Sequence, residues 1–171
     1  MIFTVGHSTR SAGEFLGLLE AHGIRQLADV RTIPRSRRHP QFAGDALAAF
    51  LGSHGVLYRH FPALGGLRKP RPDSGNTAWR NEGFRGYADY METGAFREAL
   101  QALEAFAQQA ATAVMCAEAV WWQCHRRLLA DALLVRGVPV RHILSAGEAK
   151  PHELSEFARE TEGGVRYPGL L

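Results

Sequence analysis

Apolar residues recur along this chain in two alternating patterns. Short apolar runs with β-prone residues are typical of buried strands, and they occur at 2–5, 26–30, 56–61, 113–118 and 138–144. Apolar residues spaced three and four apart predict amphipathic helices, and these are 11–23, 45–55, 95–110 and 124–137. This alternation predicts a single α/β domain with a mostly parallel sheet flanked by helices. The layering is Rossmann-like, and the pattern leaves the strand order open.

Three segments have a weaker pattern than the rest of the chain. Residues 62–83 are rich in Gly, Pro and Arg. They predict a long loop, and loops of this length are usually functional or disordered. Residues 87–91 fit one or two helical turns. The tail after Ala149 is polar and acidic, and we interpret 152–160 as a short helix.

Composition narrows the class of protein. The 171 residues are 46% hydrophobic, which is ordinary for a globular domain with a core. No apolar run has the length of a transmembrane helix, and the first residues lack the pattern of a signal peptide. With two cysteines and no export signal, we expect reduced thiols, a cytoplasmic location and no membrane partner.

The charge is uneven. From Arg25 to Arg71 there are nine Lys or Arg against two Asp or Glu, a local balance of +7, although the whole chain carries only +3. Such a block attracts phosphates, nucleic acid or acidic small molecules. The alternative is a solvated surface that is rich in arginine.

Polar residues follow the predicted strands. Ligands of parallel α/β sheets bind beyond the carboxyl ends of the strands, so we expect these residues to gather at one edge. The candidates are His7, Ser8, Asp29, Arg31, Ser36, Arg37, Gly65, Gly66, Cys116, Glu118, Cys124, His125 and Arg126.

Five blocks resemble a known family. They are GHS, DVRTIPRSRRHPQF, LYRHFPALGG, FRGYADYM and MCAEAVWWQCHRR. In this order they resemble the family called domain of unknown function 488, over about residues 2 to 144. The family has no established activity, so the resemblance implies an α/β fold and site residues within these blocks, but no reaction.

Cys124 is the main candidate nucleophile. It precedes a predicted helix and Arg126, and the positive end of a helix and nearby arginines lower the pKa of a thiol. The alternative is a small packing residue at a helix start. Cys116 ends an apolar strand, so we interpret it as structural, or as a resolving thiol if its Cα lies within about 7 Å of that of Cys124.

Glu118, His7 and His125 are candidates for proton transfer. For Glu118 we favour an ion pair with an arginine of the loop after the second strand. The cysteines are separated by seven residues, which does not match the paired spacing of zinc ligands. Adjacent Cys124 and His125 would also point in different directions on a helix. We therefore predict no metal site.

Arginine is in surplus after the second strand. Asp29 and Arg31 face the same side of a strand and can pair, but further arginines follow. We expect Arg31, Arg37 and Arg126 to hold an anion, since guanidinium grips phosphate and carboxylate with two hydrogen bonds. Asp29, Ser8 and Ser36 support them. Gly65 and Gly66 permit close approach of backbone to a ligand, or form a tight turn.

These features favour a small cytoplasmic enzyme acting on an anionic substrate, phosphorylated or nucleotide-like. No P-loop or G-x-G-x-x-G pattern is present, so we predict no cofactor. The first alternative is a nucleic-acid-binding module that uses the basic block with Trp79, Trp121 and Trp122. The second is a thiol redox sensor that uses Cys116 and Cys124. The sequence does not fix the oligomeric state.

Overall fold

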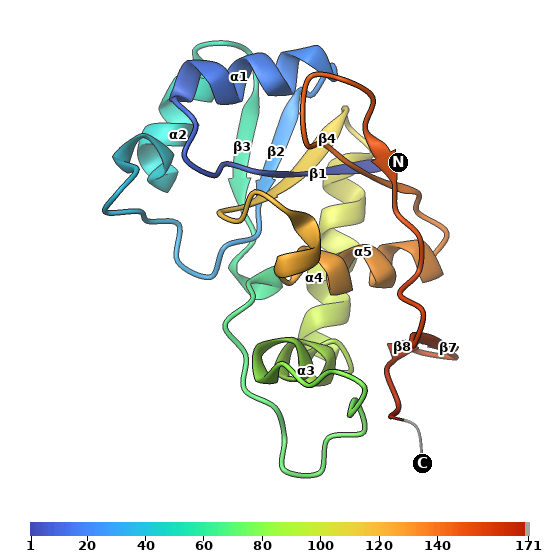
Figure 1. Cartoon of the computed structure of the whole chain (residues 1–171). Helices are drawn as coiled ribbons and strands as arrows, with labels where there is room; N and C mark the ends of the chain where they lie inside the picture. The colour runs from blue at the N-terminus through green and yellow to red at the C-terminus, as the bar shows by residue number, and fades with distance from the viewer. Residues whose placement is uncertain (170–171) are drawn as a thin grey trace.

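The computed structural model describes residues 1–169 and is organised around a six-stranded sheet with strand order β3-β2-β4-β1-β5-β6 (Figure 1). The strands are β1 (Ile2–Gly6), β2 (Gln26–Asp29), β3 (Leu57–His60), β4 (Thr112–Cys116), β5 (Val140–His142) and β6 (Lys150–Pro151). Strands β1 to β5 pair in parallel, and β6 pairs antiparallel with β5. The predicted α/β domain with a mostly parallel sheet is therefore confirmed.

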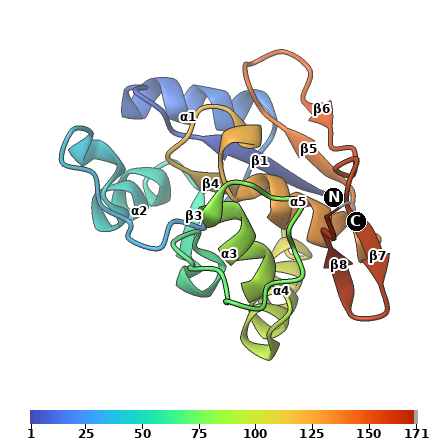
Figure 2. The same ribbon diagram turned by 60° about the horizontal axis from the view of Figure 1, so that its bottom comes forward.

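Helices cover both faces of the sheet (Figure 2). They are α1 (Ala12–Ala21), α2 (Gly44–Gly52), α3 (Glu82–Tyr90), α4 (Gly94–Ala107) and α5 (Arg126–Val135). Side chains alternate along each strand, so Leu27 and Met115 pack with α1 and α2. Their neighbours Ala28 and Cys116 pack with α3, α4 and α5 on the other face.

The position of β4 determines where a ligand can bind. It lies between β2 and β1. The helices after β1 and β2 cover one face, whereas α5, which follows β4, covers the other. The connection that leaves β4 therefore runs over one face of the sheet, and the connections that leave its neighbours β1 and β2 run over the other. Parallel sheets open a crevice at the carboxyl ends of the strands at such a point. This places Cys116, the last residue of β4, in the crevice.

Local sequence signals explain the helix starts. Ser11 and Glu14 form the expected capping box, in which each side chain accepts the backbone N–H of the other residue. Helix α3 is longer than the one or two turns expected at 87–91. It begins at Glu82 because the side chain of Asn81 accepts the backbone N–H of Phe84 and caps the first turn.

The expected helix at 152–160 is wrong. After β6 the chain is irregular and ends in a hairpin of β7 (Arg159–Thr161) and β8 (Gly164–Arg166). The physical reason is a buried carboxylate: Asp131 of α5 accepts hydrogen bonds from the side chain of His152 and from the backbone N–H and hydroxyl of Ser155. These bonds hold the tail to α5 in an extended path.

Two further boundaries differ from expectation. Helix α5 begins at Arg126, with His125 as its N-cap, so Cys124 precedes the helix in an extended conformation. The expected loop at 62–83 starts with a short 3-10 helix, Pro62–Leu64, and then runs without regular structure to the start of α3.

Within residues 1–169, no helix has the length and apolar character needed to cross a membrane.

Gly6 should be indispensable for the approach of β1 to the turn after β4. A Cβ on Gly6 would lie 1.7 Å from the carbonyl oxygen of Glu118. We expect Gly6→Ala to lower the free energy of unfolding by about 2 kcal/mol, as overpacking does. Gly17→Ala is the control, because nothing lies within 4 Å of that position in α1. It should raise stability by up to about 1 kcal/mol. Denaturant unfolding measures both, and an unaffected Gly6→Ala protein would contradict the close approach.

Candidate active site

A cleft of about 380 Å³ opens at the carboxyl edge of the sheet, around the end of β4. Its walls come from the turns after β2 and β4, Gly66 and Leu67, the start of α3 and the residues just before α5. Cys116 and Cys124 both line it. Cys116 is 3% exposed and Cys124 is 7% exposed. The cleft is therefore the place where a ligand would meet the two thiols.

The two thiols form one unit with Arg126. Their sulfur atoms are 3.2 Å apart, close enough for one thiol to donate to the other. The Nε–H of Arg126 lies 2.9 Å from Sγ of Cys116 and 3.2 Å from Sγ of Cys124. The backbone N–H of Arg126 also donates to Sγ of Cys124, at 3.4 Å. A negative charge on either sulfur is thus surrounded by donors.

These contacts favour ionisation of Cys124. The hydrogen bond from the Cys116 thiol and the charge and N–H groups of Arg126 lower the pKa of Cys124 to about 6, against the opposing effect of burial. Burial raises the pKa of Cys116 well above its usual value. Arg126 Nε lies slightly nearer to Cys116, but only Cys124 also receives a backbone N–H at the positive end of α5. We therefore assign the thiolate to Cys124 and the proton to Cys116.

The predicted role of Arg126 as a direct ligand for a substrate anion is wrong. Its side chain is 1% exposed. Besides the sulfurs, it donates to the hydroxyl of Thr4 at 3.2 Å and to the carbonyl oxygen of Glu118 at 2.6 Å. Its charge acts on the thiols from beneath the cleft.

Arg31 is also largely occupied. Its guanidinium donates to both carboxylate oxygens of Asp29, at 2.9 and 2.7 Å, and to the carbonyl oxygen of Phe42 at 2.7 Å. Tyr58 donates to the same carboxylate. Asp29 and Arg31 thus pair with each other, as their spacing allowed. Arg31 lines the cleft, but its guanidinium is already paired with Asp29, so Arg31 is not the free cation that we expected.

Gly65 and Gly66 allow close packing of protein segments. A Cβ on Gly65 would lie 2.2 Å from Oγ1 of Thr32, and one on Gly66 would lie 2.5 Å from Nδ1 of His125. Close approach is thus required, as the sequence suggested, but the partners are Thr32 and His125. Gly66 also lines the cleft, so contact of its backbone with an anion stays a prediction.

Both candidate histidines are held neutral. Burial lowers the pKa of His125 to about 4, and its Nε2–H donates to the carbonyl oxygen of Val30 at 2.8 Å. Burial likewise lowers the pKa of His7 to about 4, and its ring stacks on Phe42 with centroids 4.3 Å apart. His125 lines the cleft, whereas His7 does not.

The remaining candidates lie at the same edge with different surroundings. Glu118 is exposed and lines the cleft, but it forms no ion pair within residues 1–169, so the expected pairing with an arginine is wrong. Ser8 has a positive φ of 51° and donates its backbone N–H to Ala117. Ser36 accepts the backbone N–H of His39. Arg37 is exposed and lies outside the cleft lining.

A comparison with protein families matches residues 11–133 to the family described as domain of unknown function DUF488. The chain belongs to the DUF488 family. Comparison with curated proteins and with solved structures finds no match. The part matched to DUF488 contains Cys116, Cys124 and Arg126. Thr4 lies outside it, although its hydroxyl accepts a hydrogen bond from Arg126.

Sequence reasoning missed Asn81 and Phe84 of the cleft lining, and Thr4 beside Arg126. Arg35, one of the surplus arginines expected after the second strand, lines the cleft together with Asn81 and Phe84. Asn81 is a favoured N-cap residue, and this signal would have placed the start of α3 at the next residue. Thr4 could have been found because it carries a hydroxyl within an otherwise apolar buried strand. A buried hydroxyl requires a hydrogen-bond partner.

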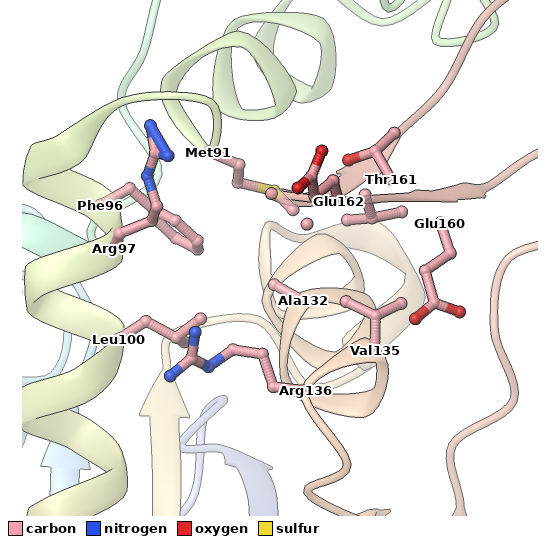
Figure 3. Close-up of a pocket in the computed structure, with 13 residues that line it drawn as sticks. Met91, Phe96, Arg97, Leu100, Ala132, Val135, Arg136, Glu160, Thr161 and Glu162 are labelled. Carbon is pink, nitrogen blue, oxygen red and sulfur yellow. The ribbon is translucent and has the colours of Figure 1, made fainter.

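A second cavity, of about 180 Å³, lies between α4, α5 and the β7–β8 hairpin (Figure 3). Its lining includes Met91, Phe96, Val135 and Glu160, but no cysteine or histidine.

No group of three or more His, Cys, Asp or Glu within the described residues of this DUF488 chain is arranged to hold a metal ion. The thiol cleft therefore remains the candidate active site.

Alkylation should identify Cys124 as the reactive thiol. Because its pKa is lowered to about 6, its reaction with iodoacetamide should be half-maximal near that pH. A free thiol would reach this point near pH 8.5. Reactivity should persist in Cys116→Ser, whose hydroxyl still donates, and disappear in Cys124→Ser. Mass spectrometry at several pH values measures both, and slow alkylation of both cysteines below pH 8 would contradict the assignment.

Proposed function

We propose that this chain is a small enzyme in which the thiolate of Cys124 attacks an anionic substrate bound in the cleft. The observation that carries the proposal is the shared Nε–H of Arg126, 2.9 and 3.2 Å from the two sulfurs at the cleft. A permanent cation buried beside a thiol stabilises the thiolate, and the thiolate is the nucleophilic form of cysteine.

The chemical step follows from this assignment. Sγ of Cys124 forms a bond to an electrophilic atom of the substrate, and the leaving group departs with the electron pair of the bond that breaks. Water then releases the bound group by hydrolysis and restores the thiol, which ionises again. Neither His7 nor His125 is well suited to act as the base, because burial lowers both pKa values to about 4.

The lining of the cleft suggests the kind of substrate. Ile33, Leu67 and Phe84 offer apolar contact, and Arg35 is the exposed cation among the lining residues. Arg35 forms no ion pair within residues 1–169. We propose a substrate with an anionic group, such as phosphate or carboxylate, attached to an apolar or aromatic body. Reduced thiols require a reducing compartment, such as the cytoplasm.

A specific observation also favours redox chemistry. Because the two sulfurs are 3.2 Å apart, Cys116 can resolve an oxidised Cys124. The thiolate of Cys124 would attack hydrogen peroxide and break the O–O bond, giving a sulfenic acid and hydroxide. The Cys116 thiol would then attack Sγ of Cys124, forming a disulfide and releasing water.

The nucleic-acid alternative has weaker support. Trp79 is 5% exposed, and Trp121 stacks on His142 with centroids 4.0 Å apart. Of the three tryptophans only Trp122, at 43% exposure, offers a large free surface. Binding through the basic block alone should weaken steeply with salt. Absence of binding to a duplex or a single strand at low salt would exclude this alternative.

The first test of the enzyme proposal measures how the charge of Arg35 affects alkylation of Cys124. Anionic iodoacetate and neutral iodoacetamide both alkylate a thiolate, so the ratio of their rates at Cys124 reports the potential in the cleft. Arg35→Ala should lower this ratio by about threefold, the effect of a nearby unit charge in partly hydrated surroundings. Arg37→Ala is the matched control, since Arg37 is exposed but does not line the cleft. Equal ratios in the three proteins would contradict the role of Arg35.

The redox candidate is tested by peroxide. Treatment with hydrogen peroxide should remove two hydrogen atoms from the wild-type mass, block both thiols and be reversed by dithiothreitol. In Cys116→Ser, oxygen atoms should add to Cys124 without disulfide formation. Direct oxygenation of Cys124 in the wild-type protein, with Cys116 unchanged, would show that Cys116 does not resolve it.

A further inference from the structure

Arg126 has no carboxylate partner among the described residues. A buried guanidinium is costly unless other groups replace its lost hydration. Its Nε–H faces the sulfurs, and its other contacts are the Glu118 carbonyl oxygen and the Thr4 hydroxyl. The carbonyl lies in the turn after β4, whereas Thr4 belongs to β1 in the middle of the sheet. Thr4 therefore ties the cation to the rigid part of the fold.

Thr4 is the first member of a chain of buried hydrogen bonds. The Thr4 hydroxyl lies 2.6 Å from Nδ1 of His142, Nε2 of His142 lies 2.9 Å from Nδ1 of His152, and Nε2 of His152 lies 2.7 Å from Asp131. All four side chains are at most 6% exposed. Asp131 also accepts hydrogen bonds from Ser155 and Tyr167. The chain thus runs from the site through β1 and β5 to α5.

When each histidine carries a single ring proton, the two ends of the chain select one direction for every hydrogen bond. Guanidinium has only donors and carboxylate only acceptors. Asp131 therefore requires the proton of His152 on Nε2, which leaves Nδ1 to accept from Nε2–H of His142. Nδ1 of His142 must then accept the Thr4 proton, and the lone pairs of the Thr4 oxygen face Arg126. A hydroxyl that donates in this way is a stronger acceptor.

His142 is shielded so that this arrangement persists. Trp121 stacks flat on its ring at 4.0 Å and 5°, and Trp121 meets His152 edge-on at 5.3 Å. Burial and the neighbouring His152 and Arg126 lower the pKa of His142 to about 3. His142 therefore stays neutral, with one donor and one acceptor nitrogen, throughout the physiological range.

We propose that Thr4, His142, His152 and Asp131 are positioning residues that hold Arg126 against the two thiols and so keep Cys124 ionised. Thr4, His142 and His152 lie outside the residues matched to the family, 11–133. Strands β1 and β5 and the segment that begins after β6 thus belong functionally to the site. The inference rests on the thiolate of Cys124, as the proposed function does, but on nothing else in that proposal.

The test is the pH dependence of Cys124 alkylation by iodoacetamide in the full chain. Thr4→Val removes the hydroxyl but keeps the shape of the side chain. It should raise the apparent pKa of Cys124 by about one unit, so alkylation at a pH below both pKa values becomes about tenfold slower. Thr4→Ser restores the hydroxyl and should restore the wild-type value.

Thr112→Val is the matched control. Thr112 is a buried threonine of β4, 0% exposed, whose hydroxyl donates to the carbonyl oxygen of Ala110 instead of joining the chain. It should leave the pKa of Cys124 unchanged. His142→Phe keeps a flat ring beside Trp121 and removes both nitrogens, so it should shift the pKa in the same direction as Thr4→Val. It also tests the chain if Thr4→Val does not fold.

The outcomes are distinct. An unchanged pKa in folded Thr4→Val, or in folded His142→Phe if Thr4→Val does not fold, would overturn the inference. A shift in Thr4→Val without one in His142→Phe would limit the effect to Thr4 and overturn the role of the longer chain. Equal shifts in Thr4→Val and Thr112→Val would mean a general loss of packing and would also overturn it. A further outcome separates the inference from the proposed function. If the pKa shifts as predicted but Arg35→Ala and Arg37→Ala show the same ratio of iodoacetate to iodoacetamide rates, the inference is supported and the proposed anion site is excluded.

Discussion

The contact of Arg126 with two sulfur atoms is the constraint on which the rest of the site depends. A guanidinium that is 1% exposed, with no carboxylate partner among residues 1–169, is tolerable only where other groups replace water around it. The proposed thiolate of Cys124 would supply the compensating charge, and Thr4 and the Glu118 carbonyl oxygen supply acceptors. The same contact lowers the pKa of the thiol, so stability of the buried cation and reactivity of Cys124 are coupled.

The sheet makes this contact possible. Strand β4 places Cys116 between β2 and β1, whose following helices α2 and α1 cover the opposite face. The cleft opens at the end of β4, between the start of α3 and the residues just before α5. Gly6 lets β1 approach the turn that carries the Glu118 carbonyl oxygen, and that oxygen accepts from Arg126. The guanidinium of Arg126 is therefore held between the end of β4 and the turn after it, and the close approach of that turn to β1 depends on Gly6.

Sequence patterns predicted which residues gather at one edge of the sheet but not the directions of their side chains. Alternating strands and helices predicted that His7, Asp29, Cys116 and Glu118 reach one edge, because parallel strands end together. Side chains beyond a strand end depend on turn geometry, so the pattern did not show that Glu118 points to solvent or that His7 stacks on Phe42. The tail was misjudged for a related reason. Its local pattern suggested a helix, whereas hydrogen bonds to Asp131, distant in sequence, hold it extended.

The use of arginine instead of histidine beside the thiol has a chemical consequence. In a cysteine–histidine pair, the thiolate and the imidazolium titrate separately, and activity is confined between two pKa values. Arg126 stays charged at any accessible pH, and His125 stays neutral above about pH 4 because burial lowers its pKa. Of Cys124, His125 and Arg126, only Cys124 then changes its charge near neutral pH. The reactivity of the thiol should rise through its pKa of about 6 and stay constant above it. Such a site therefore suits a reaction that needs a persistent nucleophile and takes its protons from water.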